Sequence, residues 1–490
     1  MFPAIPEARP ISDTHDLEAF GYKQELSRSL GGFSSFAAGF SYLSILTGVF
    51  QMFHVGFAAG GPAFWWAWPI IFVGQFLVAL CFAELAAQYP LSGSVYQWSK
   101  FVGSRALGWM AGWFYLACLV ITLAAVALAL QTTLPQISPA FQVLADGTKN
   151  AVLLGCILIA FTTAINAIGV KLLARINDLG VFAELTGAVV LIGLLGWHGL
   201  RGPGVVLDTG THGSGFGYAG PLLAAALMPS YVMYGFDTAG SLAEETTEPR
   251  RHVPRAILLA LASAALLGGL LMLLALMAAP DLRAAGLGDP TSGLPGLVKA
   301  VLGGPLGTFF LCDVGFAICV CALAVHTGTA RLMYAMARDG MLPAALARVN
   351  PTSHTPVVPV WLTGAAAVGV LVSNMNFTQI VGLIVSVSIL WANLAYLFVT
   401  VPLLAKRLRG WSPQGGFSLG RFGVPVNLAA VLWGCFMVIN IGWPRADVYG
   451  PGLQSFAAIG LTALVALAGA LYYALVLRRK PTEAVKQEAA

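Results

Sequence analysis

Twelve stretches of about 20 mainly apolar residues recur along the chain, and they limit its fold more than any other feature. A bilayer has a hydrocarbon core roughly 30 Å thick, which a helix of about 20 residues spans. Only 10% of the residues are charged, against about 25% in a typical soluble domain. The stretches are continuously apolar, whereas transmembrane strands alternate polar and apolar residues. The sequence therefore predicts an all-α polytopic membrane protein with twelve transmembrane helices, at residues 33–57, 64–88, 107–130, 151–170, 178–199, 219–243, 254–279, 304–334, 357–375, 379–401, 424–443 and 453–477.

The basic residues follow the alternation of these spans. If the N-terminus is cytoplasmic, that side holds all but five of the 26 Lys and Arg residues, the exceptions being Lys149, Arg201, Arg283, Lys299 and Arg445. The positive-inside rule then predicts that both termini are cytoplasmic. We expect a multi-pass protein of the plasma (inner) membrane. The first thirty residues carry many charges and no apolar core, so no cleavable signal peptide is expected. Residues 1–32 and 478–490 are expected to form short cytoplasmic tails.

Composition argues against several other classes of protein. The net charge of +5 follows from the membrane topology, and no contiguous basic face indicates nucleic-acid binding. The seven cysteines all fall inside apolar spans without metal-ligand spacing. The seven histidines are scattered, so neither a catalytic cluster nor a metal site is predicted. The sequence therefore indicates neither an enzyme nor a cofactor.

Two of the spans carry polar and small residues near their centres. The first contains hydroxyls and glycine within Gly39–Phe50, and the sixth contains a carboxylate, Asp237, within Pro229–Gly240. Small residues also allow close helix packing, but a carboxylate in a span normally marks a polar pathway. The first and sixth spans each open a set of five helices. Interrupted helices at matching positions of two halves predict a transport site near the midplane.

Three groups of residues resemble one family of permeases. They are Ala83–Leu85 with Tyr89–Trp98, then Gly235–Asp237 running into Glu244–Thr246 and Val253–Ile257, and finally Ala337–Pro343. Together they resemble the amino acid–polyamine–organocation superfamily, and more narrowly its amino acid/choline branch, which includes γ-aminobutyrate and choline permeases.

The resemblance implies a leucine-transporter-like fold. Residues 33–200 and 219–401 would be two inverted five-helix repeats, and 424–477 two peripheral helices. In relatives, an unwound part of the first helix offers N–H groups to a substrate carboxylate; it aligns here with Leu46, Thr47 and Gly48, although this sequence lacks the first glycine of the Gly-Ser-Gly-Val-Phe motif found in many relatives. The sixth span is expected to contribute Tyr231, Tyr234, Gly235 and Asp237 to the solute site, the two tyrosines being equally compatible with ordinary packing.

Other ionisable and hydroxyl residues have two interpretations each. Glu184, where some relatives carry lysine, is either the proton carrier or a packing anchor. Glu84 and Glu245 lie near the cytoplasmic ends of spans, where a charge need not be buried. They are expected to serve an inner gate or to anchor a loop. Thr327 and Thr329 are weak candidates for sodium ligands, since such hydroxyls usually bond to their own helix.

These observations predict a secondary active transporter that imports an amino acid or a related amino-bearing solute by alternating access, with the proton as the coupling ion. The alternatives are a choline or polyamine transporter, a sodium-coupled symporter or an amino acid exchanger. A channel is the rival from another class, because broken helices also build selectivity filters. The sequence leaves the substrate and the oligomeric state open.

Overall fold

Helices are the regular structure of this protein. The computed structural model describes residues 15–283, 285–375 and 380–478, and within these ranges the β-type pairing is one isolated parallel bridge between Leu30 and Thr246. The expected tail residues 1–14 and 479–490, and the expected helix start at 379, lie outside the described residues.

Ten helical segments of the described chain are long and apolar enough to cross a membrane. The prediction of an all-α polytopic membrane protein is therefore confirmed. These segments are built from α2 (Gly32–Leu43) with α3 (Ile45–Gly60), η1 (Pro62–Trp66) with α4 (Ala67–Gln88), α6 (Arg105–Ile137), α7 (Gly147–Ile168), α8 (Val170–Trp197), α12 (Pro249–Ala278), α14 (Gly304–Arg338), α16 (Ile380–Leu408), η8 (Gly420–Phe422) with α17 (Gly423–Gly442), and η9 (Gly452–Phe456) with α19 (Ala457–Tyr472) and η10 (Tyr473–Leu477).

The two remaining expected spans are shorter or broken helices. The span expected at 357–375 is α15 (Val357–Asn374). The span expected at 219–243 is divided into α9 (Ala219–Ala225), α10 (Leu227–Val232) and α11 (Thr238–Ser241), which η5 (Ala243–Glu245) follows. Each of the twelve expected spans thus corresponds to helical segments in the structure.

Local sequence explains several helix starts. Asp146 caps α7 by accepting hydrogen bonds from the backbone N–H groups of Thr148 and Lys149, and Ser104 caps α6 through Leu107. Such caps satisfy amides that have no partner inside the helix. α12 begins with Pro249, which needs no donor at that position.

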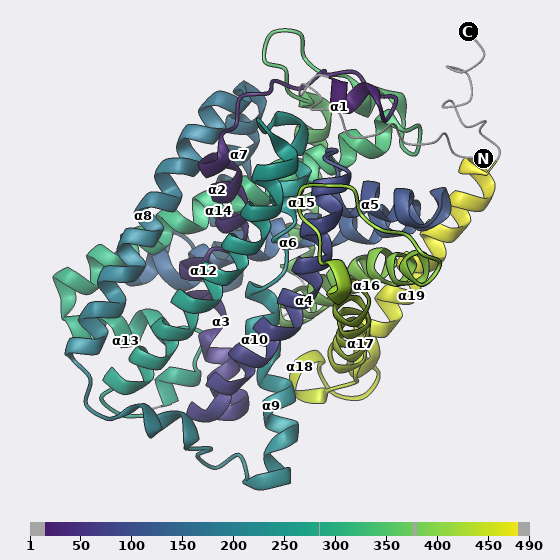
Figure 1. The fold of residues 1–490 in the computed structure, drawn as a ribbon. Helices are drawn as coiled ribbons and strands as arrows, with labels where there is room; N and C mark the ends of the chain where they lie inside the picture. Colours follow the sequence, from purple (N-terminus) through teal and green to yellow (C-terminus); the bar gives the residue numbers. More distant parts are fainter. Residues whose placement is uncertain (1–14, 284, 376–379, 479–490) are drawn as a thin grey trace, which may run out of the picture.

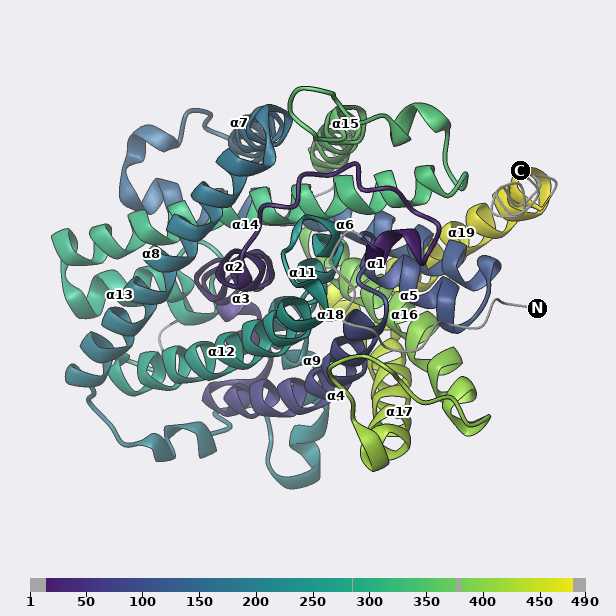
Figure 2. The same cartoon turned by 45° about the horizontal axis from the view of Figure 1, so that its top comes forward.

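The bundle has two ends, which we name by what lies there. The N-terminal face carries α1 (His15–Glu18), α5 (Ser94–Val102) and residues 339–356, and the opposite face carries α9, α13 (Gly293–Leu302) and α18 (Ala446–Tyr449) (Figure 1). Figure 2 shows α2 and α3 nearly end-on, surrounded by α8, α11, α12 and α14, with which α2 is in contact. The first span therefore runs through the middle of the molecule.

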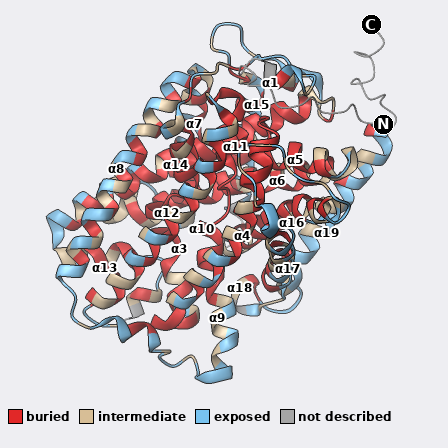
Figure 3. Ribbon diagram, in the orientation of Figure 1, coloured by how far each residue is buried: buried red, intermediate tan, exposed pale blue. Residues whose placement is uncertain are grey.

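Burial separates the centre from a lipid-facing surface. In α8, Leu179 and Phe182 are exposed, while Gly180, Val181 and Glu184 are buried. Exposed apolar side chains of this kind suit contact with lipid. The apolar part of Gly32–Gly60 is 83% buried, whereas that of Gly452–Leu477 is only 6% buried. α19 consequently lies at the edge of the helix bundle (Figure 3).

Candidate functional site

The first membrane span breaks at Ser44. This residue has φ 23° and ψ 92°, and α2 ends before it while α3 begins after it. Such a conformation costs a non-glycine residue about 1–3 kcal/mol. Its Oγ accepts a hydrogen bond from the backbone N–H of Thr47 (3.3 Å) and lies 2.6 Å from the Thr47 hydroxyl. The break was expected at Leu46–Gly48, but these residues form the first turn of α3, because Ser44 and a residue of α8 cap the helix just before them.

That residue of α8 is Glu184. Its Oε1 accepts a hydrogen bond from the backbone N–H of Leu46 (3.0 Å) and one from the Ser44 hydroxyl (3.0 Å). Helix N-termini favour negative groups because their first amides lack partners within the helix. Glu184 is 1% exposed, and its Oε2 has no hydrogen-bond partner. Glu184 therefore holds the start of α3 with one oxygen only.

The sixth span is unwound between α10 and α11, at residues 233–237. Gly235 has φ +87°, a conformation that favours glycine. A Cβ atom there would lie 1.8 Å from the Tyr42 ring. The unwound segment of the sixth span therefore passes directly against the end of α2, beside the break in the first span.

Asp237 ends the unwound segment and is completely buried. Its Oδ2 accepts a hydrogen bond from Ser94 (2.7 Å), and its Oδ1 accepts hydrogen bonds from Tyr396 (2.8 Å) and Tyr115. The Tyr396 hydroxyl lies 2.8 Å from the backbone N of Gly235. These contacts join the unwound segment to α5, α6 and α16. Asp237 thus lies at the junction of four elements.

Three tyrosines lie in a row beside the two breaks. The ring centroid of Tyr234 is 5.9 Å from that of Tyr42 and 6.1 Å from that of Tyr231. The Tyr234 hydroxyl lies 2.7 Å from that of Thr122 and also bonds to Ser388. The hydroxyls of Tyr42 and Tyr231 are buried without a partner. The row therefore presents aromatic surface and two free hydroxyl groups.

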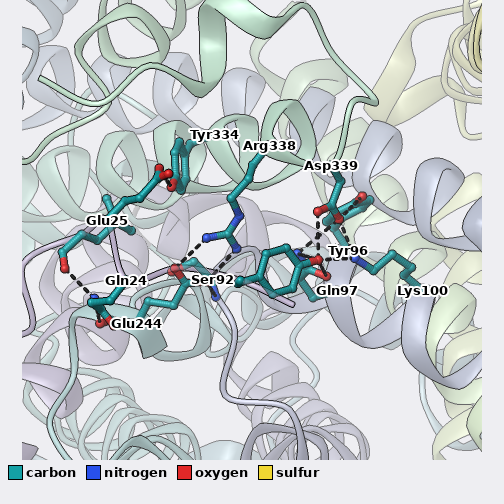
Figure 4. Close-up of polar contacts among 12 residues, drawn as sticks. Gln24, Glu25, Ser92, Tyr96, Gln97, Lys100, Glu244, Tyr334, Arg338 and Asp339 are labelled. Atoms are coloured by element: carbon teal, nitrogen blue, oxygen red, sulfur yellow. Dashed lines mark hydrogen bonds and ion pairs between the residues drawn. The ribbon is translucent and has the colours of Figure 1, made fainter. Parts of the chain in front are cut away.

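Two buried ion pairs lie at the N-terminal face. Both nitrogens at the tip of the Arg338 guanidinium bond to Glu244 (2.9 and 2.8 Å), and Glu244 also accepts from the backbone N–H of Ser92 (Figure 4). Arg331 binds Glu245 through two nitrogens (3.3 and 3.0 Å), and these side chains are 1% and 0% exposed. We call these two ion pairs the double gate, after the gating role proposed for them below.

The N-terminal segment lies across this double gate. The backbone N–H groups of Ser29 and Leu30 donate to the carbonyl of Glu245 (2.9 and 2.8 Å), and Gln24 donates to the carbonyl of Glu244. Tyr334 donates to Glu25 (2.7 Å). Opening of the N-terminal face would therefore have to displace the segment that precedes α2.

A third buried ion pair joins α5 to the end of α14. Asp339 contacts Lys100 and accepts hydrogen bonds from Tyr22 (2.8 Å) and Tyr96 (2.6 Å) (Figure 4). Burial acts to raise the pKa of Asp339, but the charge of Lys100 and the hydrogen bonds from Lys100 and Tyr96 outweigh it, so the pKa lies below its usual value. Burial and the neighbouring Asp339 charge raise the pKa of Tyr96 well above its usual value.

Glu84 at the end of α4 forms a similar pair with Arg407 and also accepts from the backbone N–H of Leu419 (2.9 Å). Glu84 and Glu245 were not expected to need burial at this end of the bundle. Both are completely buried, because arginines from distant segments reach them.

The candidate sodium ligands on α14 are already engaged. The Thr327 hydroxyl contacts Asn166 and the carbonyl of Leu323, and the Thr329 hydroxyl donates to the carbonyl of Val325 (2.7 Å). In the described part of the chain no group of three or more metal-binding side chains is found. His326 lies between Thr162 and the carbonyl of Val360, which indicates a structural role.

Comparison with known proteins identifies the family. The sequence model of the amino acid permease family matches residues 30–473. The chain belongs to the amino acid permease family. Amino-acid permease BAT1 of Arabidopsis thaliana is 27% identical, over 94% of this chain and 94% of that protein. The low-affinity putrescine importer PlaP of Escherichia coli is 27% identical, over 80% and 84%. The branched-chain amino acid permease BcaP of Bacillus subtilis is 25% identical, over 86% and 90%.

The family confirms the suspected membership of the amino acid–polyamine–organocation superfamily; the narrower amino acid/choline branch stays a prediction. This permease is a multi-pass membrane protein and, by family, a transporter of amino acids or related solutes rather than an enzyme.

Sequence reasoning missed several residues of this permease that the structure places at the site. Tyr42 and Ser44 lie within the polar run of the first span, so their position alone would have pointed to them. Tyr115, Tyr396 and Ser94 surround Asp237 but come from helices without any visible break. Arg331 carries a charge at a span end, which indicated topology only, and Arg338 and Asp339 lie in the Ala337–Pro343 motif, which indicated the family but not their ion pairs.

Proposed function

We propose that this permease is a secondary active importer of an amino acid or a related amino-bearing solute, working by alternating access with the proton as the coupling ion. The contact between the two broken helices carries the proposal, because unwound backbone within a membrane is tolerated where it lines a polar cavity or is buried in protein. The double gate supports alternating access, since two buried ion pairs at the N-terminal face would close that end of a path through these breaks.

The solute site would lie between the start of α3 and the unwound residues 233–237. Leu46, Thr47 and Gly48 would offer the positive end of α3 to a carboxylate. Tyr231, Tyr234, Gly235 and Asp237 would surround the amino group, because aromatic faces and carboxylates attract a cation. Both Tyr231 and Tyr234 lie in the row beside the breaks, which supports this assignment.

The topology forms part of the same proposal. Spans 1–5 (33–200) and 6–10 (219–401) would be inverted repeats of a leucine-transporter-like fold, with the helices at 424–477 outside them. The N-terminal face would be cytoplasmic, in the plasma membrane, so that Glu84 and Glu245 would act on the inner side. The interruptions of the first and sixth spans at Ser44 and at 233–237 support the repeat.

Glu184 would carry the coupling proton. It is a buried carboxylate at the break in the first span, with one oxygen free. Sodium coupling ranks lower because the hydroxyls of Thr327 and Thr329 bond to carbonyls of α14 itself. A polyamine or choline importer is the second candidate. The tyrosine row favours it, since such rings attract cationic groups, and PlaP is a relative described as a putrescine importer.

Uptake into proteoliposomes tests the proposal. Saturable uptake that an inward proton gradient drives, together with counterflow of labelled solute, is expected. Replacement of sodium by potassium should change neither. Ohmic currents without counterflow would indicate a channel and would refute the proposal.

A further inference from the structure

The start of α3 is already occupied by a carboxylate of this chain. Glu184 Oε1 accepts hydrogen bonds from the Leu46 N–H and the Ser44 hydroxyl, each at 3.0 Å. The Thr47 N–H donates a hydrogen bond to Ser44 Oγ, and the Gly48 N–H donates one to the Ser44 carbonyl. If the proposed function is right, a substrate carboxylate would need the same donors. Glu184 and the substrate therefore cannot both bind there in the charged form.

Glu184 differs from the other fully buried carboxylates of the described chain. Glu84, Asp237, Glu244 and Glu245 each have a partner on both oxygens, whereas Oε2 of Glu184 has none. A buried carboxylate charge without a cationic partner is costly. A proton on Oε2 would remove this charge. It would also weaken the hold on α3, because hydrogen bonds to a charged group are about twice as strong as neutral ones.

A second carboxylate lies one helical turn away. Asp313 of α14 rests against Gly187 of α8, where a Cβ atom would lie 1.8 Å from Oδ2, and this oxygen is buried without a partner. Gly187 is three residues beyond Glu184, so both carboxylates lie along one stretch of the contact between α8 and α14. The thiol of Cys321, also on α14, faces Glu184 as well. The helices α2, α7, α12 and α13 bring no charged side chain within ion-pair distance of it in the described chain.

Asp313 and Glu184 lie at different depths from the opposite face of the bundle, which orders them along a proton path from that face. At about 1.5 Å per helical residue, Asp313 lies roughly 14 Å from the start of α14 on the opposite face, and Glu184 roughly 20 Å from the end of α8 on that face. A proton that enters from the opposite face therefore reaches Asp313 before Glu184.

We infer that Glu184 and the substrate carboxylate compete for the start of α3, and that one proton, delivered by way of Asp313, decides which of them is bound. The proton passes from water to Asp313 and then to Oε2 of Glu184. Neutral Glu184 releases the Leu46 N–H, and the substrate carboxylate accepts it. After the substrate leaves on the other side, Glu184 loses the proton there and returns. Each substrate molecule is thus transported together with one proton, and the site selects solutes that bear a carboxylate.

The experiment compares Glu184→Gln, Asp313→Asn and the wild type in proteoliposomes and in thermal-shift titrations at pH 5.5 to 8.5. Asp178→Asn is the matched control, because Asp178 is a carboxylate of the same helix that bonds to Ser34 away from the break. The probes are leucine and γ-aminobutyrate, which bear a carboxylate, and putrescine, which does not. Both carboxylate probes are added separately, so that one positive response is sufficient.

In the wild type and in Asp178→Asn, apparent affinity for a carboxylate probe should fall about tenfold per pH unit on the alkaline side, as one-proton linkage requires. Glu184→Gln, which mimics neutral Glu184, should bind with an affinity independent of pH, retain counterflow and lose proton-driven accumulation. Asp313→Asn should keep the pH-dependent affinity but accumulate the probe more slowly.

Each contrary result has a distinct meaning. An unchanged pH dependence in Glu184→Gln, or loss of its counterflow while it remains folded and inserted, would overturn the inference and leave transport by the wild type standing. Uptake of putrescine alone by the wild type would overturn the carboxylate competition. If the wild type shows neither counterflow nor accumulation of any probe, the proposed function itself fails.

Discussion

Removal of Arg331 tests whether the double gate holds the N-terminal face closed. The pair with Glu245 is 1% and 0% exposed and uses two hydrogen bonds of 3.3 and 3.0 Å. Replacement of Arg331 by Met leaves the Glu245 charge buried without its partner, which typically costs about 3–5 kcal/mol. If an open state hydrates Glu245, the ratio of open to closed molecules should rise by a factor between about 100 and a few thousand, at about 1.4 kcal/mol per tenfold.

A cysteine beside the double gate, at position 92, reports this change. Ser92 is completely buried, and its backbone N–H donates to Glu244. In a Ser92→Cys background, Arg331→Met should raise the rate of alkylation by a water-soluble maleimide about tenfold or more. Protein that retains Ser92 gives the background alkylation of the native cysteines. Arg251→Ala is the matched control. Arg251 and Glu248 are 63% and 58% exposed, and such surface pairs contribute about 0–1 kcal/mol.

The double variant Arg331→Met/Glu245→Met separates the charge from the packing. It leaves no unpaired carboxylate, so its alkylation rate should return toward that of the Ser92→Cys parent. The reasoning is refuted if Arg331→Met is folded and inserted and is nevertheless alkylated at the parent rate. It is also refuted if the double variant is alkylated as fast as the single one.

Three further predictions concern the unwound segment and the Lys100–Asp339 ion pair between α5 and the end of α14. Asp237→Asn should abolish uptake while the protein stays folded in the membrane, because Ser94, Tyr115 and Tyr396 lose their charged acceptor; wild-type uptake in inserted protein would remove Asp237 from the site. Gly235→Ala should strongly reduce uptake because its Cβ would lie 1.8 Å from the Tyr42 ring. The control is Gly303→Ala, which has a similar φ of +81° but open space around the added Cβ, and it should transport normally. An equal loss of uptake in both variants would refute the explanation by a clash with Tyr42. Since the pKa of Asp339 is lowered in the folded state, its stabilising contribution is complete above its unfolded value and is lost as pH falls through the folded value. The difference in thermal stability between the wild type and Asp339→Asn should therefore stay constant from pH 8 to 5 and shrink below about pH 4; a difference that shrinks already above pH 5 would contradict this.

The sequence predicts the features that depend on continuous runs of apolar residues. It does not predict the features that depend on contacts between residues far apart in the chain. The span positions followed from runs of apolar residues. The break in the first span was placed two residues too late, because its position depends on Glu184, 140 residues further along the chain. Neither Tyr115 nor Tyr396 was identified, since an aromatic residue in an apolar span looks like any other core residue. The burial of Glu84 and Glu245 was missed because the arginines that pair with them belong to α16 and α14.

If Glu184 carries the coupling proton as proposed, the buried carboxylates of this fold would divide into fixed charges and one switchable charge. At the N-terminal face, Glu244 and Glu245 each face an arginine, which remains charged at any physiological pH. At the unwound segment, Asp237 receives three hydroxyl donors on its two oxygens, so its charge is solvated by the protein. Glu184 has donors on one oxygen only, and these donors belong to the broken helix itself. A proton can therefore change the hold of Glu184 on α3 without breaking any ion pair, whereas release of the double gate requires the separation of opposite charges. In the proposed mechanism, protonation of Glu184 and opening of the double gate would thus be two physically different steps, which is what a carrier needs if proton binding is to precede, and not to replace, the opening of its gate.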